Sequence, residues 1–226
     1  MVHSVALLTD ATLTPRQEKR LRTYISLREV ASRLVEERGF DQVTVEDICA
    51  EVEVSPRTFF NYFASKEAAV LGPDPRPIDE ACFAWFDGSH PEAPKDKPIS
   101  YRVLAYMFYL ISEELTGRMF SSVVMKRRRA IKESNPIMAR KYFAKFYVMQ
   151  QELSKKLTEF FQNNPSYRRL ETDSAEQREA VLLSAAVFSA LLNGYRQWQA
   201  EDIEHPERAL DYCNRALEDI SAIVAS

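Results

Sequence analysis

Residues 44–67 read TVEDICAEVEVSPRTFFNYFASKE, and this stretch decides the fold of the first part of the chain. It holds three helix-start signals, each a hydroxyl residue just before a helical segment: Thr44-Val45, Ser55-Pro56 and Ser65-Lys66. A hydroxyl caps the free N–H groups of a first turn, and proline fits the first helical position because its missing N–H would have no partner there. The spacing predicts two short helices joined by a tight turn, then the start of a third. This pattern is typical of helix-turn-helix proteins that bind DNA.

The second of these helices is predicted to carry the DNA-reading face. Phenylalanines at 59, 60 and 63 are assigned to packing, since an apolar helix face anchors to the core. The residues expected to face DNA are Ser55, Pro56, Arg57, Thr58, Asn61 and an edge of Tyr62. Arginine suits guanine edges or phosphate, asparagine suits adenine edges, and hydroxyl groups suit phosphate oxygens.

Two further residues stand at helix starts, where free N–H groups favour phosphate. Thr44 and Lys66 are therefore expected to contact the DNA backbone, although Thr44 also serves as a cap. Arg16, Lys19, Arg20 and Arg22 form a basic arm nearby, which is either a DNA contact or a solvated helix face. Lys126 to Arg129 form a second basic run, interpreted as solvated or ion-paired.

Outward from this stretch, the pattern predicts an all-α protein of two domains. Thr14-Pro15-Arg16-Gln17 is a capping box that starts a long helix ending before Gly39, so a first domain of three or four helices spans 14–71. Leu71-Gly72-Pro73 marks its boundary. A larger helical bundle spans 77–226, with expected helices at 100–114, 117–133, 136–162, 174–200 and 206–225.

Composition narrows the class of protein. The chain has 226 residues, is 46% apolar and 28% charged, and carries a net charge of −3, so any nucleic-acid binding must come from local placement of charge. Three separated cysteines give no disulfide or zinc spacing, and we expect no metal and no cofactor. Signal-peptide and membrane-spanning patterns are lacking, which favours a cytoplasmic protein. No nucleophile–base pair or phosphate loop indicates an enzyme.

Residues 22–71 resemble the DNA-binding domain of the TetR family of transcriptional regulators. The resemblance rests on Arg38-Gly39-Phe40, Thr44, the run from Val54 to Phe63, and Ser65-Lys66-Glu67. It implies an all-helical homodimer whose N-terminal domains bind a palindromic operator and whose C-terminal domains dimerise and often hold a small-molecule effector. One residue departs from the family pattern: Glu53 stands where many members have glycine in the turn. Either Glu53 takes a left-handed conformation or the turn differs.

The second domain is interpreted in the light of that resemblance. The apolar segment 174–200 and the last segment 206–225 are predicted to pair with their copies in a homodimer; the alternative is that both cover the core of one chain. The middle segments are rich in aromatic residues and are expected to hold an effector pocket. The residues assigned to this pocket are Tyr109, Phe120, Phe146, Tyr147, Gln150 and Asn193.

The function predicted from the sequence is a DNA-binding transcriptional regulator, most simply a repressor that a small molecule releases from its operator. Activation in place of repression stays open, because the same contacts serve both. The alternative from a different class is a helical interaction or ligand-binding protein that has lost DNA recognition. Arg57, Asn61, Tyr62 and Lys66 argue against that alternative.

Overall fold

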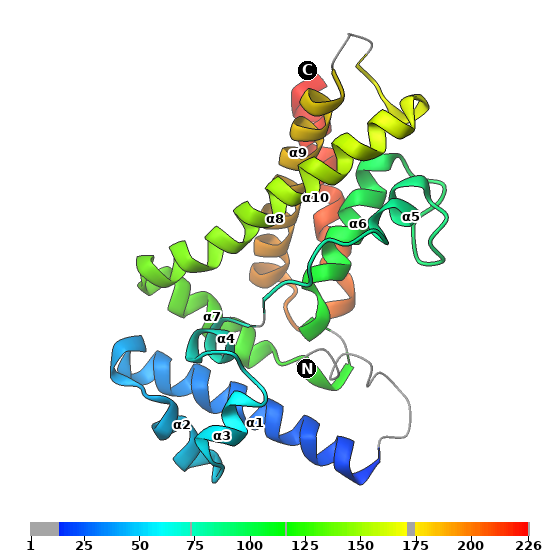
Figure 1. Ribbon diagram of the computed structural model, residues 1–226. Helices are drawn as coiled ribbons and strands as arrows, with labels where there is room; N and C mark the ends of the chain where they lie inside the picture. Colours follow the sequence, from blue (N-terminus) through cyan, green and yellow to red (C-terminus); the bar gives the residue numbers. More distant parts are fainter. Residues whose placement is uncertain (1–13, 73, 116, 171–174, 226) are drawn as a thin grey trace. The chain divides into compact units, whose positions relative to one another are not determined.

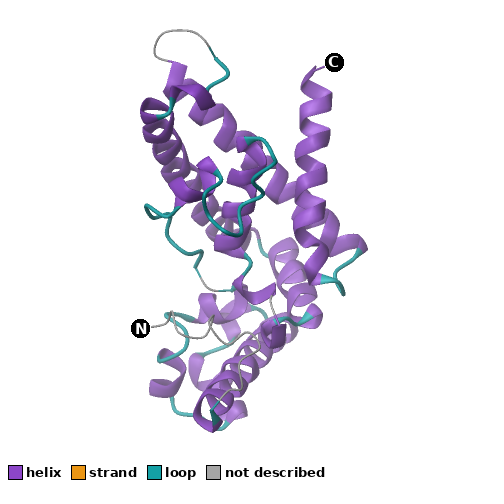
Figure 2. Ribbon diagram, turned by 90° about the vertical axis from the view of Figure 1, so that its right-hand side faces the viewer, coloured by secondary structure: helices purple, strands orange, loops and turns teal. Residues whose placement is uncertain are grey.

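The computed structural model describes residues 14–72, 74–115, 117–170 and 175–225. In these residues the chain forms ten α-helices, several short 3-10 turns and no strand, which confirms the predicted all-α class (Figures 1 and 2). Two compact units divide the chain. The first holds residues up to Asp74 together with Glu113–Tyr142, and the second holds Pro75–Ser112 and Phe143–Ser226.

The first unit is built around one long helix. Helix α1 runs from Pro15 to Arg38, with Thr14 as its cap in a capping box with Gln17, and it ends at Gly39, where φ is 85°. The other helices of the unit are α2 (Val45–Val52), α3 (Pro56–Phe60), α4 (Lys66–Leu71) and α7 (Ser122–Ser134). Leu27, Ala31 and Leu34 of α1 are fully buried, and they form the centre of the core into which α2, α3 and α4 pack.

The second unit packs the C-terminal helices together. Its helices are α5 (Cys82–Asp87), α6 (Ile99–Ile111), α9 (Ala175–Glu201) and α10 (Ala209–Ala225), and α8 (Pro136–Asn163) continues into it from the first unit. Helices α9 and α10 lie side by side (Figure 1). Their backbones come close at Gly194, where an added Cβ would lie 2.6 Å from the carbonyl oxygen of Tyr212. Glycine is therefore required at this crossing.

The compact units differ from the division at 71–77 predicted from composition. Residues 113–142, which that division places in the second domain, pack with the N-terminal helices. The expected helix at 100–114 ends at Ile111 and the one at 117–133 begins at Ser122, because the chain between them forms short 3-10 turns. The predicted start at 174 lies outside the described residues. Among the helices that the structure describes, none is long and apolar enough to cross a membrane.

Candidate DNA-reading site

The first helix of the site, α2, begins with a reciprocal cap. The Thr44 hydroxyl accepts a hydrogen bond from the Asp47 N–H (3.1 Å), and the Asp47 carboxylate accepts from the Thr44 N–H (2.8 Å) and the Thr44 hydroxyl (2.6 Å). These hydrogen bonds from Thr44 lower the pKa of Asp47, so the carboxylate stays charged beside the positive end of the helix. Thr44 is exposed as predicted, but its hydroxyl proton already has an acceptor.

The turn between α2 and α3 is left-handed at Glu53. Its backbone has φ 57° and ψ 44°, and it is the only non-glycine residue with positive φ in the part of the chain that the structure describes. The Glu53 N–H donates to the Ala50 carbonyl (3.4 Å) and the Val54 N–H donates to the Cys49 carbonyl (3.0 Å), which is a Schellman motif. Of the two outcomes left open by the sequence, the left-handed conformation is the one observed.

Helix α3 is capped by Ser55, whose hydroxyl accepts from the Thr58 N–H at 3.1 Å and lies 2.9 Å from the Thr58 hydroxyl. Phe59 and Phe63 anchor the helix: both are buried, and the Phe63 ring stacks on Tyr24 of α1 with centroids 4.9 Å apart. The outward residues of the segment, among them Ser55, Pro56, Arg57 and Asn61, are exposed, whereas Thr58 and Tyr62 are half-buried.

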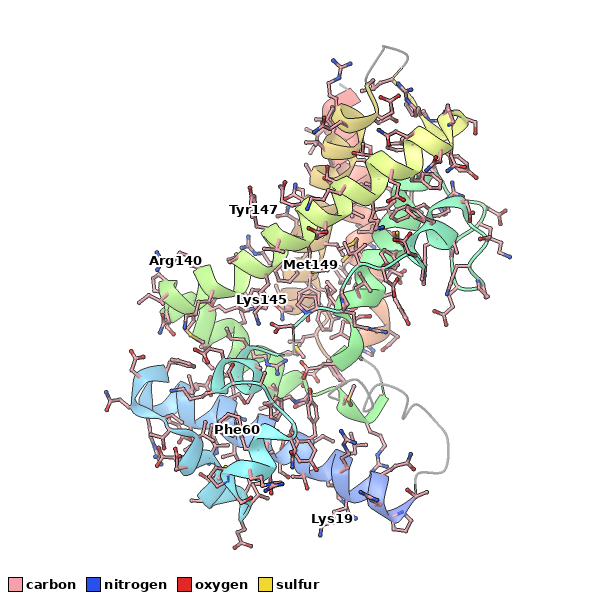
Figure 3. All side chains as sticks on the ribbon, viewed as in Figure 1. Lys19, Phe60, Arg140, Lys145, Tyr147 and Met149 are labelled. Carbon is pink, nitrogen blue, oxygen red and sulfur yellow. The ribbon has the colours of Figure 1, made fainter. Side chains whose placement is uncertain are left out.

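Phe60 was assigned to packing, and this assignment is wrong. Its side chain is 55% exposed, whereas Phe59 and Phe63 are 0% and 2% exposed. The reason is geometric: residues of an α-helix advance by about 100° each, so neighbouring positions 59 and 60 cannot both face the core of a five-residue helix. Figure 3 labels Phe60 on this unit. An exposed aromatic side chain thus belongs to the candidate reading face.

Lys66 is held by the protein itself. Its Nζ atom donates to the carbonyl oxygens of Phe40 (2.7 Å) and Val43 (2.5 Å), and it lies 4.0 Å from the centre of the Phe40 ring. The ammonium group therefore ties α4 to the segment between α1 and α2. The predicted phosphate contact of Lys66 stays a prediction, but two of its three donor directions are already used.

The basic residues of the unit fall into two groups. Arg16, Lys19 and Arg22 of α1 are exposed, and Figure 3 labels Lys19. By contrast, the arginines of α7 have carboxylate partners: Arg127 pairs with Glu36, Arg128 with Glu114 and Arg129 with Glu133. For these three arginines, the ion-paired interpretation of the run 126–129 is the one observed. The exposed basic side chains of the unit therefore include these three on α1, of which Arg22 lies 4.0 Å from Glu18, and Arg57 on α3.

A buried cluster of charged side chains lies in the first unit, which also holds the candidate reading face. Glu114 is 6% exposed and accepts hydrogen bonds from Tyr24 (2.7 Å), Arg28 (3.2 Å) and Arg128. The two arginines also donate to backbone carbonyls, Arg28 to Met119 (2.5 Å) and Arg128 to Val70 (2.9 Å). The cluster joins α1, the end of α4, Glu114, Met119 and α7.

Burial would raise the pKa of Glu114, but the positive charges of Arg128 and Arg28 outweigh burial and lower it to about 2. This cluster was not predicted from the sequence. One signal was present: Arg28 lies at helical spacing among the apolar residues Tyr24, Ala31 and Val35, a position where an unpaired charge would be costly.

The residues assigned to an effector pocket do not form one obvious group. Phe146 is buried, Tyr109 and Tyr147 are 40% and 65% exposed, and the Asn193 side chain donates to the Ser189 carbonyl on its own helix. Figure 3 labels Tyr147 and Met149, which differ in burial although both lie on α8. Phe120 belongs to the first unit and Gln150 to the second. The pocket assignment stays a prediction.

A cleft of about 480 Å³ lies elsewhere in the second unit. It is lined by residues of the 92–97 loop, α6 and α10, and it carries charges of both signs. The charged lining residues are Glu92, Lys97, Asp211, Arg215 and Glu218. Its volume falls within the range of about 300–1,000 Å³ typical of small-molecule sites. In the described residues, no group of histidine, cysteine or carboxylate side chains could hold a metal ion.

Comparison with known proteins gives results that agree with this geometry. The sequence model of the family described as "Bacterial regulatory proteins, tetR family" matches residues 27–71, which contain the second half of α1 and all of α2, α3 and α4. The HTH-type transcriptional regulator TcmR of Streptomyces glaucescens is 48% identical over 69 residues. That match spans 30% of this chain and 30% of TcmR.

Among solved structures, GusR of Salmonella enterica matches 91% of this chain and 97% of its own, with 17% sequence identity and a TM-score of 0.37. A TM-score this low does not establish a shared arrangement of the whole chain. The similarity is therefore that of residues 27–71 to the family model and of 69 residues to TcmR.

Proposed function

Because the sequence model of the TetR family of bacterial regulatory proteins matches its N-terminal domain, we propose that the protein is a sequence-specific DNA-binding transcriptional regulator. One observation carries the proposal: α2 and α3 are joined by a closed left-handed turn, and α3 leaves Arg57 and Asn61 exposed while Phe59 and Phe63 hold it to the core. Such a helix can enter the major groove with its polar face outward.

The proposed DNA contacts divide by chemistry. Arg57 and Asn61 are exposed and carry the groups that recognise guanine and adenine edges. The other proposed contacts position the helix on the DNA backbone. They are Ser55, Pro56 and Thr58 at the start of α3, and Thr44, Tyr62 and Lys66 around it. The exposed Arg16, Lys19 and Arg22 add favourable charge for a polyanion, which offsets the net charge of −3 of the whole chain.

A homodimer is the second part of the proposal. Helices α9 and α10 expose large apolar side chains: Val181 and Leu182 are 47% and 58% exposed, and Ile223 and Val224 are 74% and 81% exposed. A contiguous exposed apolar patch marks an interface, and we propose that these side chains belong to one. A twofold dimer would present two reading helices, which suits a palindromic operator with half-sites about 34–36 Å apart.

Repression relieved by a small effector completes the proposal. A ligand changes DNA affinity only if it binds the released form more tightly than the DNA-bound form. The mixed-charge cleft of the second unit, near Tyr101 and Arg215, is of suitable size for a polar ligand. A ligand that raises the melting temperature of the protein and also releases the bound duplex would identify the effector. The predicted cytoplasmic location follows from DNA as the partner.

The main proposal is tested by selecting bound DNA from random duplexes with the full chain. We expect enrichment of a palindrome. Arg57→Ala and Asn61→Ala should each weaken binding of the recovered duplex by about 1–3 kcal/mol if the residue contacts a base. Gln162→Glu, an exposed change on α8, serves as the control. If no sequence is enriched, the protein is not a sequence-specific regulator, and the interaction-protein alternative takes its place.

A further inference from the structure

Phe60 is a large apolar side chain on a face that is otherwise polar. It is 55% exposed, and it stands three residues after Arg57 and four after Pro56, both of which are exposed. Since residues three and four apart share a helix face, Phe60 lies between Arg57 and Pro56 on the outward side of α3. A phenyl ring in this place either meets an apolar group of the partner or remains in water at a cost.

The Phe60 ring is held in position by a neighbouring aromatic ring. Phe60 meets Phe59 edge to face, with centroids 5.4 Å apart and an interplanar angle of 85°. Phe59 is fully buried and also contacts Phe63 at 5.6 Å, so the rings form a short series from the core to the surface. An aromatic side chain has only two rotatable torsions, which makes such a supported ring a rigid probe.

We propose that Phe60 determines operator specificity by contacting the 5-methyl group of a thymine in the major groove. Phenylalanine has no donor or acceptor, so it cannot recognise phosphate oxygens or the polar edges of bases. The apolar feature that base pairs present in the major groove is the thymine methyl group. This inference rests on the proposed function, because it names one more contact of the same reading face.

The test removes the methyl group from the DNA and the ring from the protein. In the duplex recovered by selection, each thymine of both half-sites is replaced by deoxyuridine, one symmetric pair at a time. The dissociation constant is measured by fluorescence anisotropy at fixed salt for wild type, Phe60→Ala and Phe60→Leu. Val123→Ala is the matched control, because it removes apolar atoms from a side chain that is 52% exposed on α7, outside the reading face.

At one symmetric position we expect the loss of both methyl groups to weaken wild-type binding at least about fourfold, the value of one buried methyl group. Phe60→Ala should bind the thymine and deoxyuridine duplexes equally, whereas Val123→Ala should keep the wild-type difference. Phe60→Leu, which retains an apolar group, should keep part of it. Melting curves establish that the variants fold.

The inference is overturned if replacing thymine with deoxyuridine weakens wild-type binding at no position. It is also overturned if the replacement weakens the binding of Phe60→Ala as much as that of wild type. In either case a palindrome is still bound and the proposed function stands. If selection recovers no sequence at all, the proposed function and this inference fail together. The two failures are therefore distinguishable.

Discussion

At the scale of single residues, Glu53 is the position where local backbone geometry and residue type disagree most. Its φ of 57° is a conformation that glycine adopts freely and that costs other L-residues about 1–2 kcal/mol. The hydrogen bonds of Glu53 and Val54 close the turn in spite of this cost. The turn before the reading helix thus contains a strained residue, Glu53, whose N–H is hydrogen-bonded.

Replacing Glu53 with glycine should therefore stabilise the protein. We expect Glu53→Gly to raise the free energy of unfolding by about 1 kcal/mol, because the left-handed cost disappears while the backbone hydrogen bonds remain. Ala50→Gly is the matched control: Ala50 is exposed inside α2, and glycine there should destabilise by a similar amount. Thermal unfolding measures both. Equal destabilisation by the two changes would show that Glu53 is unstrained.

The sequence predicted the caps at this scale and missed one side-chain direction. Thr14, Thr44, Ser55 and Ser65 all accept the N–H hydrogen bonds expected of them, because a cap depends only on residues three positions away. The exposure of Phe60 depends on which face of a five-residue helix meets the core. Tertiary packing decides which face is buried. The sequence, with three phenylalanines within five residues, therefore did not show which of them would be exposed.

At the scale of elements, Lys66 connects α4 to the segment before α2. Replacing Lys66 with alanine removes two hydrogen bonds from a charged donor to the carbonyls of Phe40 and Val43, and we expect a loss of about 2 kcal/mol in the free energy of unfolding. Lys19→Ala, at an exposed site of α1, should leave stability unchanged.

The two roles considered for Lys66 give different salt dependence. A phosphate contact would make the salt dependence of operator binding shallower by about one unit in Lys66→Ala. A purely structural lysine would leave that slope unchanged and lower only the melting temperature. A variant with wild-type stability would contradict the structural role.

The Glu114 cluster holds several elements of the first unit together. Glu114→Gln leaves Arg28 and Arg128 without a buried countercharge, which should cost about 3–5 kcal/mol of stability at neutral pH. Glu133→Gln is the control, because Glu133 pairs with Arg129 at the surface and such pairs contribute little. Chemical denaturation measures both variants. Similar behaviour of the two would contradict a stabilising role for the cluster.

The same cluster gives a pH signature with a definite sign. The pKa of Glu114 is about 2 in the folded protein, below its ordinary value of 4.5, so its charge stabilises the folded state above pH 4.5. This contribution is lost as pH falls from about 5 toward 2. The difference in unfolding free energy between wild type and Glu114→Gln should therefore shrink on acidification. A difference that is constant from pH 7 to pH 3 would contradict the lowered pKa.

At the scale of the whole molecule, the proposed dimer gives the clearest prediction. Leu182 is 58% exposed on α9, and a charge in the centre of an apolar interface would be left without a partner. Leu182→Glu should shift a dimer to a monomer in sedimentation experiments and weaken binding to a palindrome. Gln162→Glu adds the same charge at an exposed site of α8 and should change neither. A wild-type dimer in Leu182→Glu would exclude this face as the interface.

The sequence predicted the helical class and most helix bounds, but not how the chain divides into compact units. Helical periodicity is visible within one segment, so α8 and α9 were located to within a few residues. The packing of residues 113–142 with the first unit depends on contacts between Glu114 and residues more than 80 positions earlier in the chain. No local pattern carries that information.

The crossing at Gly194 has a consequence for how this protein can change over generations. Every amino acid other than glycine carries a Cβ, and at this position a Cβ would clash with the backbone around Tyr212 and Cys213. Amino-acid substitutions at 194 are therefore closed to the protein unless the two helices separate. Exposed residues around the crossing, such as Asn193 and Arg196, do not meet this backbone limit. The α9–α10 pair combines a backbone contact that permits no variation with an outer surface open to new partners.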